Sequence, residues 1–402
     1  LKMTMTTNKN HNSPNVPNLR FPEFEGEWKI VSLQEIASIN PKSEPLQNRF
    51  FYIDLEAVEK GELRKIQEIL QEEAPSRAQR VINNNDILFQ CVRPYQKNNY
   101  IHKEPNTSMT QWVASTGYAQ IRTTESPNYI YHLLNTDGFN RKVMVRCTGS
   151  SYPAINSEDL STIHFYLSTD KNEQCKIARL LDLLDERIAT QNKIIERYKS
   201  LIRGINQYAF TNTGINYKLG EICEIRSGYS GNQLTLKNGL KVSRSETLSE
   251  HKVNMERVGY VAPFESSENY RLQIGDILFS NINSVEYIGN TAFIDKDYNL
   301  YHGMNLLRLI PKKELVIPFY LYLVLNTNRL LNHFKTVCNK AVSQASINQT
   351  ELGKTIVLIP NLMNQNRICE LFQTLYTKLE AERYFISLLQ GQKQHLLRQM
   401  FI

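Results

Sequence analysis

The residues best suited to chemistry in this 402-residue sequence are one Leu-Gly-Lys-Thr segment and a few scattered carboxylates. Residues 352–355 resemble the end of a P-loop, but Asn348 stands where that phosphate-binding loop needs its earlier glycine. We therefore interpret the segment as the lead-in to a strand. Asp182 and Asp185 lie on a helical pattern, and they are better explained as its solvated face than as an acid/base pair.

The other catalytic and metal-binding motifs are missing from the sequence. It contains no GxGxxG, HExxH, GxSxG or EF-hand pattern, and no Pro-Pro pair from which an amino-methyltransferase signature could be built. The eight histidines are scattered, and the six cysteines form no CxxC pair. We expect no catalytic residue, no metal site, no cofactor bound by this chain, and buried free thiols.

Length and composition indicate a folded protein of two or three domains. Hydrophobic residues make up 41% and charged residues 22% of the chain, and its net charge of +7 suits an anionic partner without proving one. We find no apolar run long enough to span a membrane and no signal peptide, so we expect a cytoplasmic protein. Residues 1–27 are interpreted as a flexible leader, in which Leu1-Lys2, before the first Met, can be a start-site artefact.

The elements that must position any functional residues occur twice in the chain. Five pairs of segments align at offsets between 186 and 192 residues: 28–39 with 216–225, 83–90 with 273–280, 127–136 with 318–327, 151–167 with 342–359, and 173–210 with 364–401. Each copy is a globular part of about 145 residues followed by a long helix. Short runs at 86–89 and 277–279 predict strands, and 128–135 and 319–326 predict helices. This mixture predicts a β-rich α+β fold.

Both long helices carry a heptad pattern, which is typical of a coiled coil. The a positions are Leu181, Ile188, Ile195, Ile202 and Ala209 in the first helix and Phe372, Leu379, Ile386, Lys393 and Met400 in the second. The d positions are Ile177, Leu184, Gln191, Tyr198 and Ile205, and Ile368, Leu375, Glu382, Leu389 and Leu396. We favour an antiparallel pair within one chain over a coiled coil between two chains, because the partner is already tethered.

Gln191 and Glu382 are polar residues at equivalent d positions near the middle of the two helices. An antiparallel pair would bring them together, where buried polar side chains would fix the register of the helices. The alternative is that both point to solvent on an imperfect seam.

A duplicated, mildly basic chain without catalytic motifs suggests a protein that presents two similar surfaces at a fixed distance. DNA offers matching half-sites on one face. A helix of 38 residues spans on the order of 57 Å, or roughly 17 base pairs. We expect an uncontacted gap of about 5 to 10 base pairs, below this upper limit.

The order of motifs in each half resembles the specificity (S) subunit of type I restriction-modification enzymes. The resemblance covers nearly the whole chain and rests on WKIVSLQEIASI and YKLGEICEIRSG, NNDILFQ and GDILFSN, SSYPAIN and SQASIN, and EQCKIARLLDLLDERI. The leader segment LRFPEFEGEWK fits as well. The chain departs from the family in STDKN, where a Pro-rich approach is usual, and in Asn364-Gln365, where the second EQ is expected.

The resemblance implies two target-recognition domains separated by two long antiparallel coiled-coil helices. The boundaries would be a leader (1–27), domain 1 (28–171), a central helix (172–212), domain 2 (213–361) and a C-terminal helix (362–402). Each domain would read half of a bipartite site in double-stranded DNA, and the helices would set the gap and bind two modification subunits. Those partners would use S-adenosylmethionine, and restriction subunits would add ATP/Mg-driven cleavage.

The candidate DNA-binding residues lie in loops that are basic, aromatic or rich in amides and hydroxyls. Arginine suits guanine, and Asn or Gln suits adenine. The candidates are Arg93, Tyr95, Lys97, Asn98, Asn99, Ser150, Ser151, Tyr152, Ser227, Tyr229, Ser280, Asn281, Asn283, Ser284, Ser343 and Gln344. The turn at 227–232 could also bring backbone amides to a phosphate.

Two alternatives remain open at this point. One is a coiled-coil protein-interaction scaffold without DNA reading, which predicts no sequence-specific binding even with partners present. The other is a fused restriction-methylation enzyme, against which the missing methylase and nuclease motifs count heavily. The sequence leaves the target bases, the gap length and the number of partner subunits open.

Overall fold

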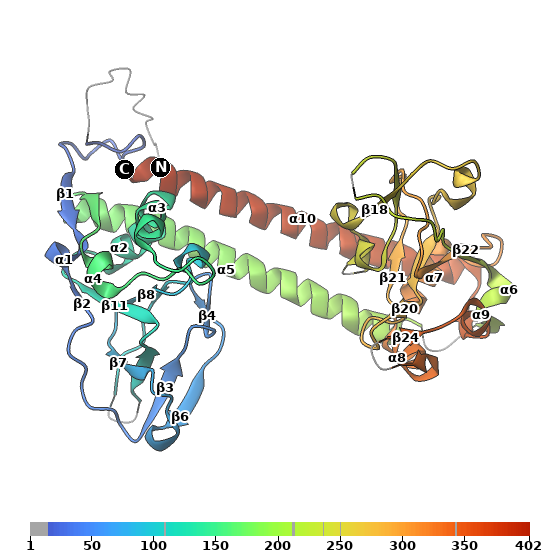
Figure 1. The fold of residues 1–402 in the computed structure, drawn as a ribbon, viewed down its shortest axis with the longest axis horizontal. Helices are drawn as coiled ribbons and strands as arrows, with labels where there is room; N and C mark the ends of the chain where they lie inside the picture. The colour runs from blue at the N-terminus through green and yellow to red at the C-terminus, as the bar shows by residue number, and fades with distance from the viewer. Residues whose placement is uncertain (1–14, 108–109, 211–213, 236, 250, 342–343) are drawn as a thin grey trace. The chain divides into compact units, whose positions relative to one another are not determined.

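The computed structural model describes residues 15–107, 110–210, 214–235, 237–249, 251–341 and 344–402. The chain forms two compact units: Leu1–Asn192 with Tyr384–Ile402, and Lys193–Arg383. Each unit therefore holds one globular part, a segment of helix α5 (Lys171–Tyr208) and a segment of helix α10 (Leu362–Met400) (Figure 1).

The globular part of the first unit contains two four-stranded sheets. One has the order β2 (Ala37–Ile39), β11 (Tyr118–Thr123), β8 (Ile87–Gln90), β9 (Tyr100–Ile101), and the other β6 (Gln67–Leu70), β3 (Arg49–Ile53), β10 (Trp112–Ser115), β7 (Ala78–Ile82). Smaller pairs are β1 (Lys29–Ser32) with β12 (His164–Leu167), and β4 (Val58–Glu59) with β5 (Glu62–Leu63). The short helices are α1 (Leu33–Ile36), α2 (Pro127–Leu134), α3 (Asp137–Arg146) and α4 (Ser157–Ser161).

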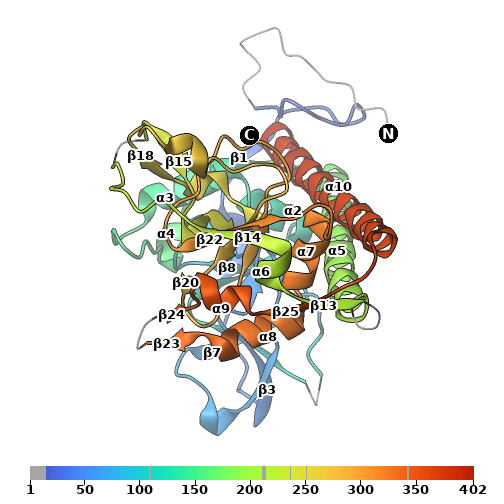
Figure 2. The same cartoon turned by 90° about the vertical axis from the view of Figure 1, so that its right-hand side faces the viewer.

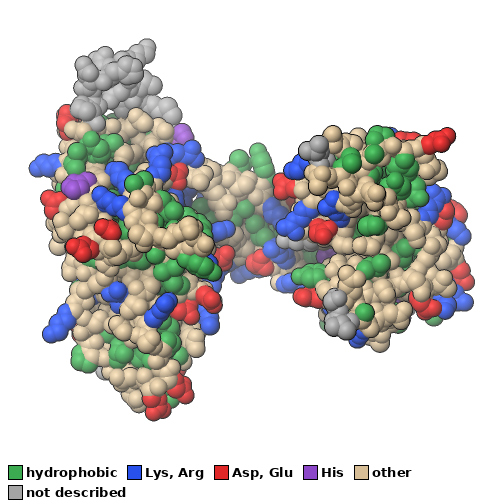
Figure 3. Space-filling model, in the orientation of Figure 1, with side chains coloured by type: hydrophobic (Ala, Val, Ile, Leu, Met, Phe, Trp, Pro, Cys, Tyr) green, Lys and Arg blue, Asp and Glu red, His purple; other side chains and the backbone are tan. Residues whose placement is uncertain are grey.

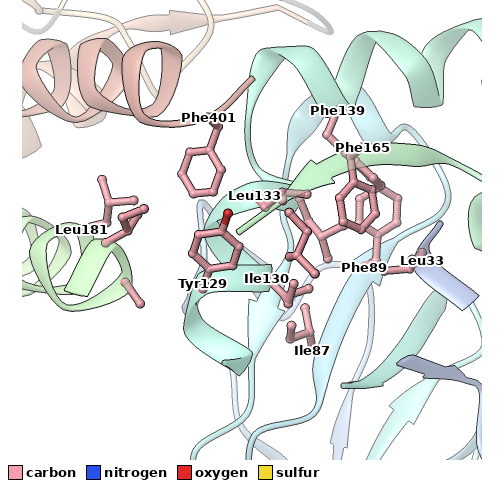
Figure 4. Close-up of a cluster of buried hydrophobic side chains, with 14 of the residues drawn as sticks. Leu33, Ile87, Phe89, Tyr129, Ile130, Leu133, Phe139, Phe165, Leu181 and Phe401 are labelled. Carbon is pink, nitrogen blue, oxygen red and sulfur yellow. The ribbon is translucent and has the colours of Figure 1, made fainter. Parts of the chain in front are cut away.

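The main core of the first unit joins this globular part to both long helices. Phe89, Tyr129 and Leu133 from the globular part cluster with Leu181 of α5 and with Phe401, which follows α10 (Figure 4). The Phe401 ring lies 5.2 Å from the Tyr129 ring, measured between centroids. The helix ends are thus part of the folded unit.

Residues 15–27 are not a flexible leader, and the prediction is wrong for them. Leu19 and Phe21 are buried, and the guanidinium of Arg20 donates two hydrogen bonds, of 2.6 and 2.9 Å, to the carboxylate of Glu173. Glu173 is fully buried at the start of α5, where Trp28 also donates to it. This segment is held in place because a buried carboxylate needs a charged partner. Residues 1–14 lie outside the described residues.

The globular part of the second unit contains one four-stranded sheet, where the first unit has two, together with smaller sheets (Figure 2). Its central sheet has the order β14 (Cys223–Ser227), β22 (Leu306–Pro311), β19 (Ile277–Ser280), β21 (Thr291–Phe293). The remaining strands are β20 (Ile282–Asn283), β24 (Ala345–Ser346), β23 (Asn339–Lys340), β13 (Ile215–Lys218), β25 (Ile356–Ile359), β15 (Leu240–Val242), β18 (Gly259–Val261), β16 (Leu248–Ser249) and β17 (Lys252–Val253). The short helices are α6 (Leu219–Ile222), α7 (Pro318–Leu325), α8 (Asn328–Val337) and α9 (Gln349–Gly353).

The same internal ion pair supports the central sheet of each unit. Asp86, just before β8, accepts two 2.8 Å hydrogen bonds from Arg122. Asp276, just before β19, is 2.6 Å from Arg308, and both side chains are buried. The Asp of each Asp-Ile-Leu segment therefore ties a turn to the neighbouring strand. Both the predicted strands and the predicted short helices, α2 and α7, are confirmed.

The heptad seam is confirmed inside each unit, because no predicted a or d side chain is exposed. In the first unit, α5 and α10 run antiparallel: Lys393 forms an ion pair with Asp185 at 2.5 Å, and the Arg187 guanidinium lies over the Phe385 ring. In the second unit, the ring of Phe210 stacks on Phe372. The pairing is therefore made within the chain.

The cysteines are all free thiols, as predicted, but they are not all buried. Cys175 is exposed on α5, and Cys147 is half-buried. The prediction is wrong for Cys175 because this residue occupies position b of the heptad, two residues before the d position Ile177. Position b faces away from the a/d seam of a coiled coil, so the thiol stays in contact with solvent.

Candidate nucleic-acid interface

A small three-stranded arrangement occurs at the same place in both units. In the first unit, Val92 and Thr148 both form bridges to Ala154, and residues 148–154 make a hairpin with two 2.9 Å backbone hydrogen bonds. In the second unit, β20 pairs with β24, which pairs with β23. Each arrangement joins the residues after strand β8 or β19 to the hairpin that follows the third short helix of its unit, α3 or α8. Many of the predicted candidates lie on these two surfaces.

Arg93 and Tyr152 are brought together in the first unit. Arg93 has a left-handed backbone with φ of 53°, and its amide donates a 2.8 Å hydrogen bond to the carbonyl of Pro153. Its guanidinium lies over the Tyr152 ring, 4.3 Å from the centroid. Tyr152 is 63% exposed, and Ser150 and Ser151 are exposed beside it in the hairpin. Tyr95 is also half-exposed, in the turn that follows Arg93.

The next candidates in that turn form contacts within the protein. The Lys97 ammonium donates to the Asn135 carbonyl and, at 2.6 Å, to Asp137, whose pKa this hydrogen bond lowers. Asn98 accepts a hydrogen bond from the backbone of Lys60. Asn99 is only 2% exposed and is bonded to Gln90 and Asn135. The prediction that Asn99 meets DNA is wrong, because its amide holds the turn against β8.

The second unit has an equivalent surface with different chemistry. At the 190-residue offset that aligns β8 with β19, Arg93 corresponds to Asn283. Asn283 donates to the Ser280 hydroxyl and accepts from the Ser284 amide. Ser284 and Gln344 are exposed, whereas Ser280 is buried and cannot face a ligand. Asn281 donates to the Ile347 carbonyl, and Ser343 lies outside the described residues.

Ser227 and Tyr229 lie in a separate part of the second unit. Ser227 is exposed at the end of β14. The Tyr229 ring stacks on Phe264 at 4.0 Å between centroids and meets Tyr270 edge-on. Gly228 between them approaches the Gly303 carbonyl so closely that a Cβ would collide with it. Tyr229 thus packs in an aromatic cluster, and the proposed phosphate contact by the turn's amides stays a prediction.

Sequence reasoning missed several cations near the hairpin of the first unit. On the face shown in Figure 3, Lys and Arg side chains gather over the upper part of this unit, around α3. Arg141 and Lys142 are exposed on that helix, and Arg146 ends it. Arg80, on β7, is half-buried, and its Nε has no hydrogen-bond partner among the described residues. A single arginine in a strand matches no sequence motif. Arg80 becomes a candidate only in the structure, because its buried Nε has no hydrogen-bond partner there among the described residues.

The two predicted register residues fall in different units. Gln191 is buried on α5, with 5% of its surface exposed, and Glu382 is half-buried on α10. Both face the seam side of their own helices. Whether they meet stays a prediction.

No metal or membrane feature is found in the described residues. No group of three or more His, Cys, Asp or Glu side chains in that part of the chain could hold a metal ion. Likewise, none of its helices is long and apolar enough to cross a membrane.

Comparison with known sequences identifies relatives for both halves of the chain. A family model for the "Type I restriction modification DNA specificity domain" matches residues 25–199 and again residues 215–385. The type I restriction enzyme MjaX specificity subunit of Methanocaldococcus jannaschii is 37% identical over 188 residues, which are 46% of this chain and 44% of that protein. The chain therefore spans less than half the length of this relative. The MjaVIII specificity subunit of the same organism is 23% identical over 93% of this chain and 91% of its own.

Two solved structures share the fold. A chain from work on complex assembly and conformational transition of the type I R-M system aligns with a TM-score of 0.60 and 22% identity, over 92% of this chain and 96% of its own. A type I restriction-modification S subunit from M. genitalium aligns with a TM-score of 0.59 and 15% identity, over 96% and 99%. The duplicated α+β architecture with two long helices is thus a known fold.

Proposed function

The chain belongs to the family of type I restriction-modification DNA specificity proteins, and from this membership we propose that it reads a bipartite DNA site with one unit per half-site. Its role is sequence specificity, and the family is non-catalytic. A scaffold that does not read DNA is the less favoured alternative, because both halves match a DNA specificity domain.

The duplication is the observation that carries this proposal. Both units present a hairpin beside the end of a central strand, and the exposed side chains there differ. Arg93 in the first unit is replaced by Asn283 in the second, and these residues suit different bases. The two half-sites should therefore differ in sequence.

The long helices would serve two further purposes in this proposal. They would set the unspecified gap between the half-sites, and they would bind two modification subunits. Apolar side chains that stay exposed on the helices support a protein-binding role: Leu183, Tyr384 and Leu388 in the first unit, and Leu201, Tyr208 and Leu371 in the second.

Catalysis would reside in the partner subunits of a cytoplasmic complex. Modification subunits would bind S-adenosylmethionine and methylate adenine, and restriction subunits would use ATP and Mg²⁺. Methyl transfer by the purified chain alone would contradict this assignment of catalysis to the partner subunits.

Mapping methylated adenines tests the proposal directly. Cells carrying this chain and its modification subunits should methylate one bipartite sequence. Replacing residues 28–171 with the same region of another family member should change one half-site and leave the other intact. An unchanged methylation pattern after this replacement would rule out the model of two readers.

A further inference from the structure

Arg80 and Arg93 are among several arginines on the first unit for which no ion pair with a carboxylate is found within the described part of the chain. Three arginines of this unit are paired: Arg20 with Glu173, Arg122 with Asp86, and Arg49 with Glu68. Arg80 and Arg93 form no such ion pair, and Arg93 contacts an aromatic ring instead. Both guanidinium groups therefore remain available to an anionic or electron-rich partner.

The surroundings of Arg93 favour contact with a base edge. Its backbone is anchored to Pro153, and the face of its guanidinium is covered by the ring of Tyr152. Stacking occupies the flat face of a guanidinium and leaves its N–H edge free to form paired hydrogen bonds. The O6 and N7 atoms of guanine in the major groove match that edge.

The surroundings of Arg80 favour a different contact. The side chain is half-buried, its Nε lacks a hydrogen-bond partner among the described residues, and burial lowers the pKa of its guanidinium. It lies close enough to Cys91, two residues before Arg93, for its charge to act on that thiol. A partly desolvated, unpaired cation is stabilised by an anion, and a backbone phosphate supplies one.

We propose that Arg93, held in place by Tyr152, reads a guanine in the half-site of the first unit, and that Arg80 binds a backbone phosphate beside it. The inference rests on the proposed function and names the residues that carry it in this unit. The counterpart of Arg93 in the second unit is Asn283, which lacks the guanidinium fork. Base reading by arginine at this position is thus confined to one half-site.

The two roles are separated by selecting duplexes from a random-sequence DNA library with the complex of this chain and its modification subunits. The wild-type complex first defines both half-sites. Arg93→Ala should lower affinity for that site by about 10- to 100-fold and relax the preference at one base pair of one half-site. Arg93→Lys should relax the preference at the same base pair, because lysine lacks the paired N–H donors of the guanidinium. It should keep the salt dependence of binding, because the positive charge remains. An unchanged preference in both variants would overturn the assignment.

Tyr152 is a positioning residue, and the same selection tests it. Tyr152→Phe keeps the ring and should preserve the guanine preference, whereas Tyr152→Leu removes the stacking and should weaken it at that base pair only. Tyr152 is 63% exposed, so neither change threatens folding. Equal behaviour of the two variants would overturn its positioning role.

Arg80→Ala should weaken binding to all sequences alike and reduce the slope of log K against log salt by about 0.9. Arg49→Ala is the matched control, because it removes the same charge from an exposed pair with Glu68. An unchanged slope in Arg80→Ala, or an equal loss in the control, would overturn the phosphate contact. If the wild-type complex selects no sequence at all, the proposed function itself is wrong. This result differs from failure of the residue assignments, in which the wild-type complex selects a site and the variants select the same one.

Discussion

At the residue scale, two glutamines hold the globular parts to the long helices. Gln174 of α5 and Gln365 of α10 are fully buried. The side-chain oxygen of Gln174 accepts a hydrogen bond from the Ser126 amide, and that of Gln365 accepts one from the Ile317 amide. Ser126 and Ile317 are the residues directly before the prolines that begin α2 and α7. The Gln of the repeated Glu-Gln and Asn-Gln pairs is therefore a structural residue.

Replacing Gln174 with Leu should destabilise the first unit. The change removes the acceptor of a buried backbone amide, and an unsatisfied buried donor costs about 1–3 kcal/mol. Urea unfolding should show this loss, and hydrogen exchange should speed up around Ser126. Gln390→Leu, on the exposed surface of α10, is the control and should change neither. Equal stability of the two variants would show that the hydrogen bond to Ser126 contributes nothing.

His102 should make the first unit sensitive to acid. The side chain is fully buried between Tyr100 and Trp112, and burial lowers its pKa to about 4. Above pH ~6.5 the imidazole is neutral in both the folded and the unfolded chain. Between pH ~6.5 and about 4 only the unfolded chain takes up the proton, so folding stability falls, by about 3 kcal/mol in all.

The variant His102→Phe tests this titration. It keeps a ring between Tyr100 and Trp112 and removes the ionisable group. Urea unfolding at pH 7 and pH 4, followed by Trp fluorescence, should show a smaller loss of stability in the variant than in the wild type. A parallel loss in both proteins would assign the acid sensitivity to other groups.

At the element scale, the sequence predicts what is local and misses what depends on distant partners. The heptad seam and the helices α2 and α7 were predictable because their periodicity lies within a few turns. The burial of Asn99 was not, because it depends on Asn135, and the ordering of residues 15–27 was not, because it depends on Glu173. Arg93 could be predicted as a candidate, but its partner Tyr152 comes from a hairpin much further along the chain.

The residues that end the long helices should be as important as their seams. Phe401 packs on Trp28 and Tyr129 in the first unit, and Phe210 packs on Tyr320 in the second. Phe401→Ala should destabilise the first unit by about 3 kcal/mol, since a buried ring is lost. It should also shift the fluorescence of Trp28, whereas Phe210→Ala should leave that signal unchanged. A Trp28 response to Phe210→Ala alone would contradict the assignment of these contacts.

At the scale of the whole molecule, duplication is the feature from which most of the function was predictable. Two copies of one sequence pattern indicate two similar surfaces, and the family model that matches both halves describes a DNA specificity domain, from which we propose that these surfaces read DNA. The boundaries between the two units could not be predicted from the sequence in the same way. Each unit combines the start of one long helix with the end of the other, and such a division joins segments that lie far apart in the sequence.

The proposed role of the helices in setting the gap predicts the effect of lengthening both. One extra heptad after Asn192 in α5 and one before Tyr384 in α10 keeps the a/d pattern in register. Seven residues add about 10 Å of helix, or about 3 base pairs of DNA. Methylation mapping should then show a gap longer by about that amount between two unchanged half-sites. A heptad inserted in α5 alone should abolish specific methylation, because the seams lose their register. If the doubly extended chain kept the original gap, the helices would not be what sets it.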